Sequence, residues 1–276
     1  MYNVNLPALD YLTLTTFDPT AMAAFWSWHS DILHGRKDAK RMQYTGVIAH
    51  HETGSAFFGS AEQKGAAHFL LQVSGLLSES AWNALQSQVH EGRARVTRID
   101  LQVTLPYNRN DWSQAAIFET VSKNSPGRSV SFVESQSAPD GGKLATVYYG
   151  SRTSDRVTRL YEKPGMGEDV FIRFETEYKA GRARELGRML ATGHDTLKNV
   201  LAGEIATFPH DGVRRHFQEH LANPLPVQVQ RESGNTKKWL LTQVLPALDR
   251  FLNDHNNPHG EDVATAFLRV IMDHIG

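Results

Sequence analysis

Residues 95–105 read RVTRIDLQVTL, an alternation of polar and apolar side chains that is typical of a β-strand. Alternate residues of a strand share a face, so Arg98 and Asp100 lie on one side while Ile99 and Leu101 lie on the other. The apolar side can pack against helices while the other side keeps its charges. This stretch therefore predicts a sheet with one apolar face and one polar face.

Two later segments, 156–163 (RVTRLYEK) and 171–179 (FIRFETEYK), alternate in the same way. Each has a face that carries charged or phenolic groups: Arg159, Tyr161 and Lys163 in the first, and Arg173, Glu175, Glu177 and Lys179 in the second. If the three strands share one sheet, these groups combine with Arg98 and Asp100. Carboxylates can hold Mg²⁺ or Mn²⁺, guanidinium groups neutralise phosphate oxygens, and a tyrosine oxygen can attack phosphorus. The mixture suits phosphoryl transfer, although the solvated face of an antiparallel sheet would show the same pattern.

The same periodicities and the turn residues predict the rest of the chain. We expect strands at 11–16, 43–49, 55–60, 67–74, 95–105, 128–134, 145–150, 156–163 and 170–179, and helices at 18–35, from 78, 110–123, 182–191, 194–206, 212–221, 236–254 and 260–275. This order predicts an α+β fold, with a mostly antiparallel sheet and helices on one face. Two related α+β units, 1–92 and 93–192, would precede a helical region at 193–276.

Composition excludes several kinds of protein. The 276 residues contain no cysteine, which excludes disulfides, thiolate metal sites and cysteine nucleophiles. No stretch approaches the roughly 20 apolar residues that a membrane span needs. The first residues lack a basic segment followed by an apolar block, so we expect no signal peptide and a cytoplasmic location. The net charge of −1 argues mildly against a protein that coats DNA regardless of sequence.

Three stretches, in order, resemble the Rep_trans family of replication initiators, which plasmids and phages carry. They are TRIDLQVTL at 97–105, TVYYGSRTSDRVTRLYEKPG at 146–165, and FIRFETEYK with Ala-Arg-Glu after it at 171–185. The middle stretch is the most specific of the three. The segment YLTLTT at 11–16 is compatible with the family, and the likeness covers residues 8–190.

The resemblance implies a site-specific, relaxase-type endonuclease that starts rolling-circle replication. Such an enzyme nicks one strand of DNA at an origin, forms a 5′-phosphotyrosine link, and leaves a 3′ hydroxyl for a polymerase. The resemblance also implies assistance by Mg²⁺ or Mn²⁺, a homodimer, and a host helicase or polymerase as partner.

Carried over position by position, the resemblance gives each candidate residue a role. Tyr161 falls on the nucleophile. The resemblance places Asp100 and Glu175 on the metal, and Arg152, Arg159 and Lys163 on basic positions that hold phosphates, with Arg159 and Lys163 flanking the nucleophile. Strand parity adds three candidates from the polar faces: Glu177 as a second metal ligand beside Glu175, and Arg98 and Arg173 on DNA phosphates. Tyr148 and Tyr149 are the fallback nucleophiles because they lie in the same motif. The chain has no His-hydrophobic-His strand of the kind that relaxases use, so the metal would rest mainly on carboxylates.

Two other functions fit parts of the sequence. A Rep-like fold could serve as an origin-binding regulator that does not cut DNA. Residues His216, Glu219 and His220 have the spacing His-x-x-Glu-His of inverted zinc peptidases, and Glu261 could be a third zinc ligand. In a chain with 13 histidines this short motif arises easily by chance.

Overall fold

A computed structural model describes residues 7–32, 36–107, 113–135, 144–164, 170–193, 196–221 and 229. The chain divides into two compact units, Met1–Glu232 and Ser233–Gly276, and the described residues all belong to the first. The helices predicted at 236–254 and 260–275, and Glu261 with them, lie outside the described residues.

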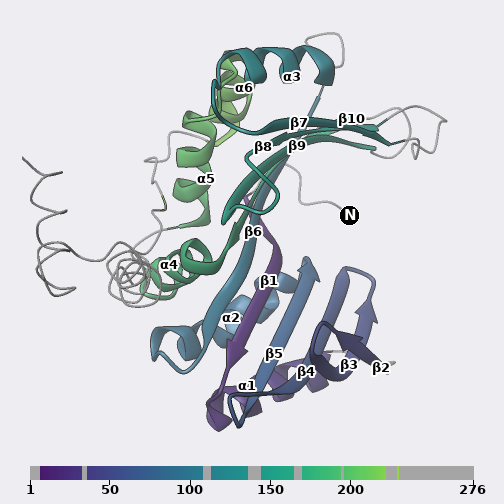
Figure 1. The fold of residues 1–276 in the computed structure, drawn as a ribbon, viewed down its shortest axis with the longest axis vertical. Coiled ribbons are helices and arrows are strands. Elements are labelled where there is room, and N and C mark those ends of the chain that lie inside the picture. The colour runs from purple at the N-terminus through teal and green to yellow at the C-terminus, as the bar shows by residue number, and fades with distance from the viewer. Residues whose placement is uncertain are drawn as a thin grey trace, which may run out of the picture. The chain divides into compact units, whose positions relative to one another are not determined.

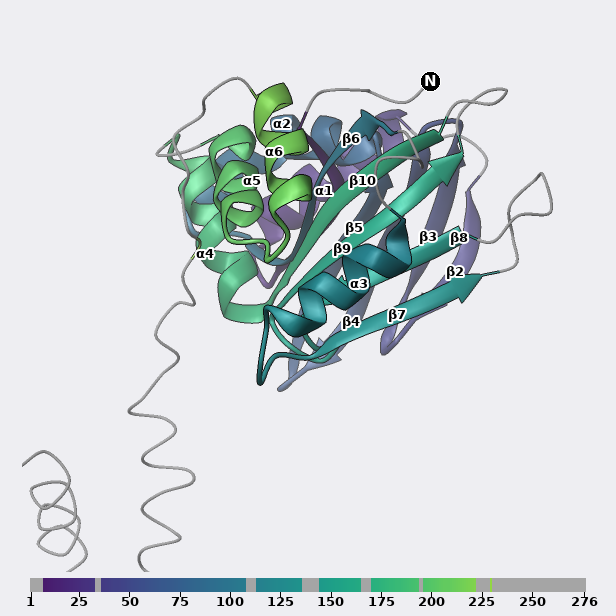
Figure 2. The same cartoon turned by 90° about the horizontal axis from the view of Figure 1, so that it is seen from above.

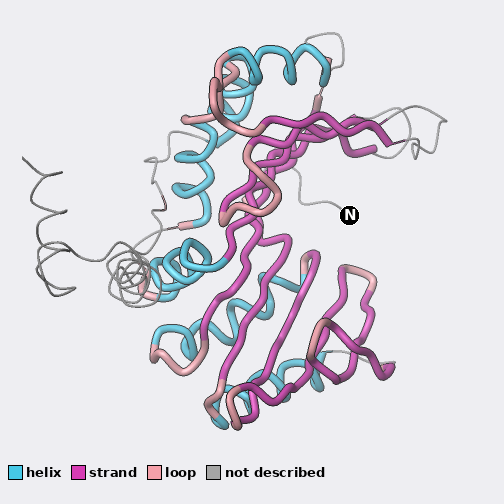
Figure 3. Tube along the Cα trace, in the orientation of Figure 1, coloured by secondary structure: helices cyan, strands magenta, loops and turns pink. Residues whose placement is uncertain are grey.

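The described chain runs twice through the same order of elements (Figures 1 and 3). The first half contains β1 (Ala8–Thr16), α1 (Pro19–Ile32), β2 (Lys37–Arg41), β3 (Tyr44–His51), β4 (Gly54–Gln63), β5 (Ala66–Gly75) and α2 (Leu77–His90). The second contains β6 (Arg95–Pro106), α3 (Gln114–Lys123), β7 (Val130–Ser135), β8 (Leu144–Tyr149), β9 (Arg156–Pro164), β10 (Val170–Lys179) and α4 (Ala180–Ala191). Two further helices follow, α5 (Leu197–Ala206) and α6 (Asp211–Leu221).

All ten strands form one antiparallel sheet in the order β2-β3-β4-β5-β1-β6-β10-β9-β8-β7. In each half the first strand pairs with the last, and the other strands follow outward as a meander. The two first strands, β1 and β6, pair with each other and join the halves (Figure 1). The predicted α+β fold with a mostly antiparallel sheet is confirmed.

Strand β2 is an element that the sequence analysis missed. Its residues, Lys-Asp-Ala-Lys-Arg, have no alternation of apolar side chains. The segment forms a strand because it pairs with β3 from Lys37↔Ile48 to Arg41↔Tyr44 at the edge of the sheet. Charged side chains on an edge strand also discourage pairing with other molecules.

Several helices begin at residues other than those predicted, for reasons visible in the capping bonds. Helix α3 begins at Gln114 rather than 110, because Ser113 Oγ accepts a hydrogen bond from Ala116 N. Helix α2 begins at Leu77, and Ser78 Oγ donates to the carbonyl of Val73 instead of capping the helix. Asp18, where the first helix was predicted to begin, caps α1, since its Oδ1 accepts hydrogen bonds from the amides of Thr20 and Ala21.

The apolar face of the sheet carries the core, and the described helices contact the sheet on this side (Figure 2). Fully buried side chains from both halves meet across the central strands, with Leu12 of β1 opposite Ile99 of β6. Helix α4 packs closely on β6, because Gly187 lies where a Cβ atom would meet Val96. One continuous core therefore runs under the whole sheet.

The opposite face differs between the two halves. In the first half it carries a small separate cluster of Tyr44, Phe57 and Leu70. In the second half it carries the charged side chains that strand parity predicted. Among the described helices, none has the length and apolar character needed to span a bilayer.

Candidate active site

The three predicted polar strands lie side by side, with β10 between β6 and β9. Their register places Glu177 opposite Asp100, and Glu175 opposite Arg159. Tyr161 lies opposite Arg173. The prediction that these polar faces combine in one sheet is therefore confirmed.

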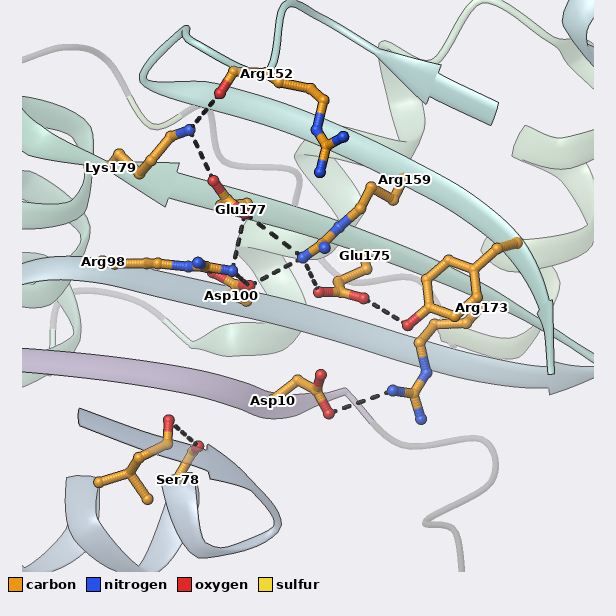
Figure 4. Close-up of polar contacts among 12 residues, drawn as sticks. Asp10, Ser78, Arg98, Asp100, Arg152, Arg159, Arg173, Glu175, Glu177 and Lys179 are labelled. Atoms are coloured by element: carbon orange, nitrogen blue, oxygen red, sulfur yellow. Dashed lines mark hydrogen bonds and ion pairs between the residues drawn. The ribbon is translucent and has the colours of Figure 1, made fainter. Parts of the chain in front are cut away.

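The charged groups form a connected network (Figure 4). Arg98 binds Asp100 with two hydrogen bonds, 2.9 Å from Nε to Oδ1 and 2.6 Å from Nη2 to Oδ2. Its Nη2 also lies 2.9 Å from Glu177 Oε2. Arg159 Nη2 lies 3.0 Å from Asp100 Oδ2 and 3.6 Å from Glu177 Oε2, and it also bonds Glu175. One guanidinium nitrogen thus lies where three carboxylates converge.

Burial changes the acidity of these groups. Asp100 is only 1% exposed, and this burial raises its pKa to about 7 against the opposing influence of Arg98. The negative charges of Glu175 and Glu177 raise it further. Burial alone would also raise the pKa of Glu177. The hydrogen bond from Lys179 and the charge of Arg98 outweigh burial, so the pKa of Glu177 is lowered. The pKa values of Asp100 and Glu177 therefore shift in opposite directions, although the two carboxylates contact the same arginines.

Tyr161 is joined to this network through its hydroxyl. Its Oη donates a hydrogen bond of 2.6 Å to Glu175 Oε2. Burial, followed by the charge of Glu175, raises the pKa of Tyr161 well above its usual value. At neutral pH the tyrosine is therefore a neutral phenol whose proton points at a carboxylate. That arrangement is the one a general base needs to activate an oxygen nucleophile.

Arg173 lies next to the tyrosine and is held from two other strands. Its Nε donates to Thr104 Oγ1 of β6 at 2.9 Å. Its Nη1 lies 3.3 Å from Asp10 Oδ1 of β1, as Figure 4 shows. The guanidinium carbon is 6.0 Å from the centre of the Tyr161 ring. Lys163 shares this face, and burial together with the charge of Arg173 lowers its pKa.

Arg152 lies on the turn between β8 and β9, one strand away from the carboxylates. Its guanidinium carbon is 5.3 Å from the ring centre of Tyr148, and its carbonyl accepts a hydrogen bond from Lys179 Nζ at 2.7 Å. The turn begins at Gly150, whose φ of 108° favours glycine. The predicted basic position thus belongs to the rim of the site.

The two fallback tyrosines point to opposite faces of β8. Tyr148 lies opposite Arg159, on the polar face. Tyr149 packs edge-on against Phe208 on the helix side, at a distance of 5.7 Å between ring centres. Of the two, only Tyr148 shares a face with the network.

The carboxylates do not fit a metal ion as they are arranged. Their oxygens are hard ligands of the kind that Mg²⁺ prefers, but Arg159 Nη2 already lies at their meeting point. In the part of the chain that the structure describes, no group of three or more His, Cys, Asp or Glu residues could hold a metal ion. A cation could reach these carboxylates only after Arg159 had moved.

The zinc-peptidase motif lies on α6, as the spacing predicts. The ring centres of His216 and His220 are 5.3 Å apart, but one nitrogen of each ring is within hydrogen-bonding distance of a backbone carbonyl oxygen. His216 Nε2 lies 3.1 Å from the carbonyl of Pro106, and His220 Nδ1 lies 2.8 Å from that of His216. Glu219 is exposed beside them. The local geometry is that of a helix held to the end of β6.

The sequence analysis missed two residues of the site, both on β1. Asp10 lies in a register shift between Leu9 and Tyr11, where strand parity cannot assign a face. The ring of Tyr11 lies beneath Arg98, with 4.1 Å between the guanidinium carbon and the ring centre. The alternation of residues 11–16 was visible in the sequence, but its pairing with β6 was not.

Comparisons with known proteins give no family for this chain. No family model matches it, and no curated protein matches it. Two solved structures show weak similarity. DynU16, a protein of the dynemicin biosynthetic locus, is 12% identical with a TM-score of 0.19, over 66% of this chain and 92% of its own. The di-domain ARO/CYC protein StfQ of the steffimycin biosynthetic pathway is 9% identical with a TM-score of 0.20, over 77% of this chain and 97% of its own.

Proposed function

We propose that this chain cuts one strand of DNA and rejoins it through a covalent bond between Tyr161 and the 5′ phosphate. The observation that carries the proposal is the hydrogen bond from Tyr161 Oη to Glu175 Oε2. It links an oxygen nucleophile to a base on a face where Arg159, Arg173 and Lys163 supply positive charge. The motifs that resemble Rep_trans initiators point to the same reaction at an origin of replication.

In the proposed reaction, Tyr161 Oη attacks the scissile phosphorus and its proton passes to Glu175. The bond between phosphorus and the 3′ oxygen breaks as the Oη–P bond forms. Lys163 gives the departing 3′ oxygen a proton, since a lowered pKa makes its ammonium a stronger acid. Rejoining runs in reverse: the 3′ hydroxyl attacks phosphorus, and Tyr161 leaves with the proton from Glu175.

Arginine side chains stabilise the negative charge on the phosphate in this scheme. The side chains of Arg98 and Arg159 are 31% and 24% exposed, so a phosphate can approach them from the open side of the sheet. Guanidinium forks suit the non-bridging oxygens that gain charge in the transition state. The divalent cation, the homodimer and a helicase or polymerase partner are further proposals that follow from the resemblance.

A second function is a DNA-binding regulator that does not cut. The pairing of the site carboxylates with Arg98, Arg159 and Lys179 favours it, because three acids and three bases leave the network formally neutral. A neutral network attracts phosphate less strongly than a row of unpaired cations. The two functions differ in whether a covalent adduct forms.

The test uses supercoiled plasmid that carries the gene with its native flanking DNA. Wild-type protein, Tyr161→Phe and Tyr148→Phe are incubated with the plasmid in Mg²⁺, in Mn²⁺ or in EDTA. We expect the wild-type and Tyr148→Phe proteins to give nicked circles and to stay attached to the DNA after denaturation. The Tyr161→Phe protein should do neither. The EDTA arm shows whether the reaction needs a divalent cation.

Tyr148→Phe is the matched control, because it removes a hydroxyl from the same face one strand away. If the Tyr161→Phe protein still formed a covalent adduct, the nucleophile would be another residue. If the wild-type protein bound a specific site but did not nick the DNA, the result would favour the regulator and contradict the proposed strand-cutting activity.

A further inference from the structure

A cavity of about 360 Å³ lies where β1 ends and β6 begins, away from Tyr161. Residues from four parts of the chain line it, including the segment between β1 and α1, strand β5, the start of β6 and helix α4. Its lining includes Phe17, Asp18, His68, Arg93, Arg95 and Arg184. None of these residues takes part in the proposed cleavage reaction.

The lining is positively charged. It contains three arginines and one acid, Asp18, whose carboxylate accepts two amide hydrogen bonds at the start of α1. Arg93 lies 2.8 Å from Glu91. Arg95 and Arg184 are both exposed to solvent. A chain with a net charge of −1 thus concentrates positive charge here, which favours an anionic ligand.

An exposed aromatic ring stands beside these arginines. Phe17 is 51% exposed, and its ring centre lies 4.3 Å from that of His68. His68 is held in place by a hydrogen bond of 2.7 Å with Tyr44 Oη. A large apolar ring that is fixed from below and open above can stack on a nucleic acid base.

The cavity lies at one end of β6, the strand that carries Arg98 and Asp100 of the candidate active site. The register pairs Thr15 with Arg95, and Thr13 with Arg98. Because alternate residues of β1 share a face, Arg95 and Arg98 also share a face, despite the register shift between them. Two arginines of β6 therefore lie in a row on one face, Arg95 in the cavity and Arg98, which is paired with Asp100, in the network that holds Tyr161.

We propose that this cavity is a subsite for single-stranded DNA, distinct from the cleavage site. Arg95 and Arg184 bind phosphates there, and Phe17 stacks on an unpaired base. Continuity with the row on β6 favours a strand that passes over both sites rather than a free nucleotide. The proposal rests on the proposed function, because that function makes single-stranded DNA the substrate.

The test measures binding without cleavage. The Tyr161→Phe protein, in EDTA, is titrated against a fluorescein-labelled single strand of mixed sequence, and fluorescence anisotropy is recorded at several salt concentrations. Adding Phe17→Ala should weaken binding about 5-fold to 150-fold, which is the usual effect of losing one stacked base. Adding Arg95→Ala should reduce the slope of log K against log salt by about 0.7, the value for one phosphate contact.

Arg215→Ala is the matched control, since this exposed arginine lies on α6, on the helix side of the sheet. Thermal unfolding checks that each variant folds. If Phe17→Ala and Arg95→Ala bind like the control, the subsite is wrong, even when wild type forms its adduct with plasmid. If a mononucleotide competes as well as the strand, the ligand is a free nucleotide and the proposal also fails. Variant-sensitive binding without any adduct would instead overturn the proposed function and leave the subsite standing.

Discussion

Glu175 and Glu177 lie two residues apart on the same face of β10, yet they have different partners. Glu175 accepts the hydrogen bond from Tyr161, whereas Glu177 pairs with Lys179 at 2.8 Å and with Arg98. If Glu175 is the general base, Glu175→Gln should slow adduct formation by about 10²-fold to 10⁴-fold. Glu177→Gln removes the same charge from the same strand, and it should slow the reaction by less than about tenfold. Single-turnover rates of adduct formation measure both.

Equal losses in the two variants would contradict the base assignment. That result would mean that the carboxylates serve only to hold the arginines in place. Because each substitution leaves part of a buried ion pair without its charge, thermal unfolding must accompany the rates. Addition of Glu175→Gln to Tyr161→Phe, in the binding assay, shows whether DNA affinity is preserved.

At this scale the sequence predicted which side chains share a face but not how they pair. Alternation placed Asp100, Glu175 and Tyr161 on polar faces, and the structure brings those faces together. The position of Arg159 among three carboxylates depends on the register between strands that are distant in sequence. No local pattern encodes that register, so the sequence did not predict that a guanidinium group lies among the carboxylates.

At the scale of elements, the contact between α4 and β6 fixes the strand that carries Asp100. A Cβ atom added at Gly187 would overlap Val96 Cγ2, which Val96→Ala removes, and would lie 2.8 Å from Val96 Cβ, closer than side chains pack. Gly187→Ala should therefore lower the free energy of unfolding by about 1–3 kcal/mol, although alanine favours helices. Val96→Ala alone should cost about 1–3 kcal/mol through lost burial. Denaturant unfolding of both variants gives these values.

The double variant tests the cause. If the clash with Val96 explains the loss of stability, the protein that carries both substitutions should be more stable than the sum of the two single losses predicts. The difference should be about 0.5–3 kcal/mol in the free energy of unfolding. Simple additivity would mean that Gly187 matters for some other reason, such as backbone geometry.

Elements with strong periodicity were predictable, and those formed by pairing alone were not. The alternation of 95–105 and 171–179 predicted β6 and β10 closely. Strand β2 has mostly charged residues and exists because β3 offers it a partner, which is a tertiary cause. Without β2 the two halves still looked alike, but the predicted first half had one strand fewer than the second.

At the scale of the whole described fold, one sheet and one core join the two halves. The sequence predicted two related units at 1–92 and 93–192, and in the structure β1 of the first half and β6 of the second pair along most of their length. The polar network also crosses this junction, since Asp10 of the first half binds Arg173 of the second. The halves should therefore unfold together rather than as independent domains.

Leu12 tests this cooperativity, because it is fully buried on β1 and lies opposite Ile99 on β6. Leu12→Ala should lower the free energy of unfolding by about 2–5 kcal/mol. Hydrogen exchange should then show equal losses of protection in β5 of the first half and β10 of the second. Met42→Ala, at a residue that is 85% exposed, should change neither strand. If β5 alone lost protection, the halves would be separate folding units, and the site residues contributed by β1 could be disordered without unfolding the strands that carry Tyr161 and Glu175.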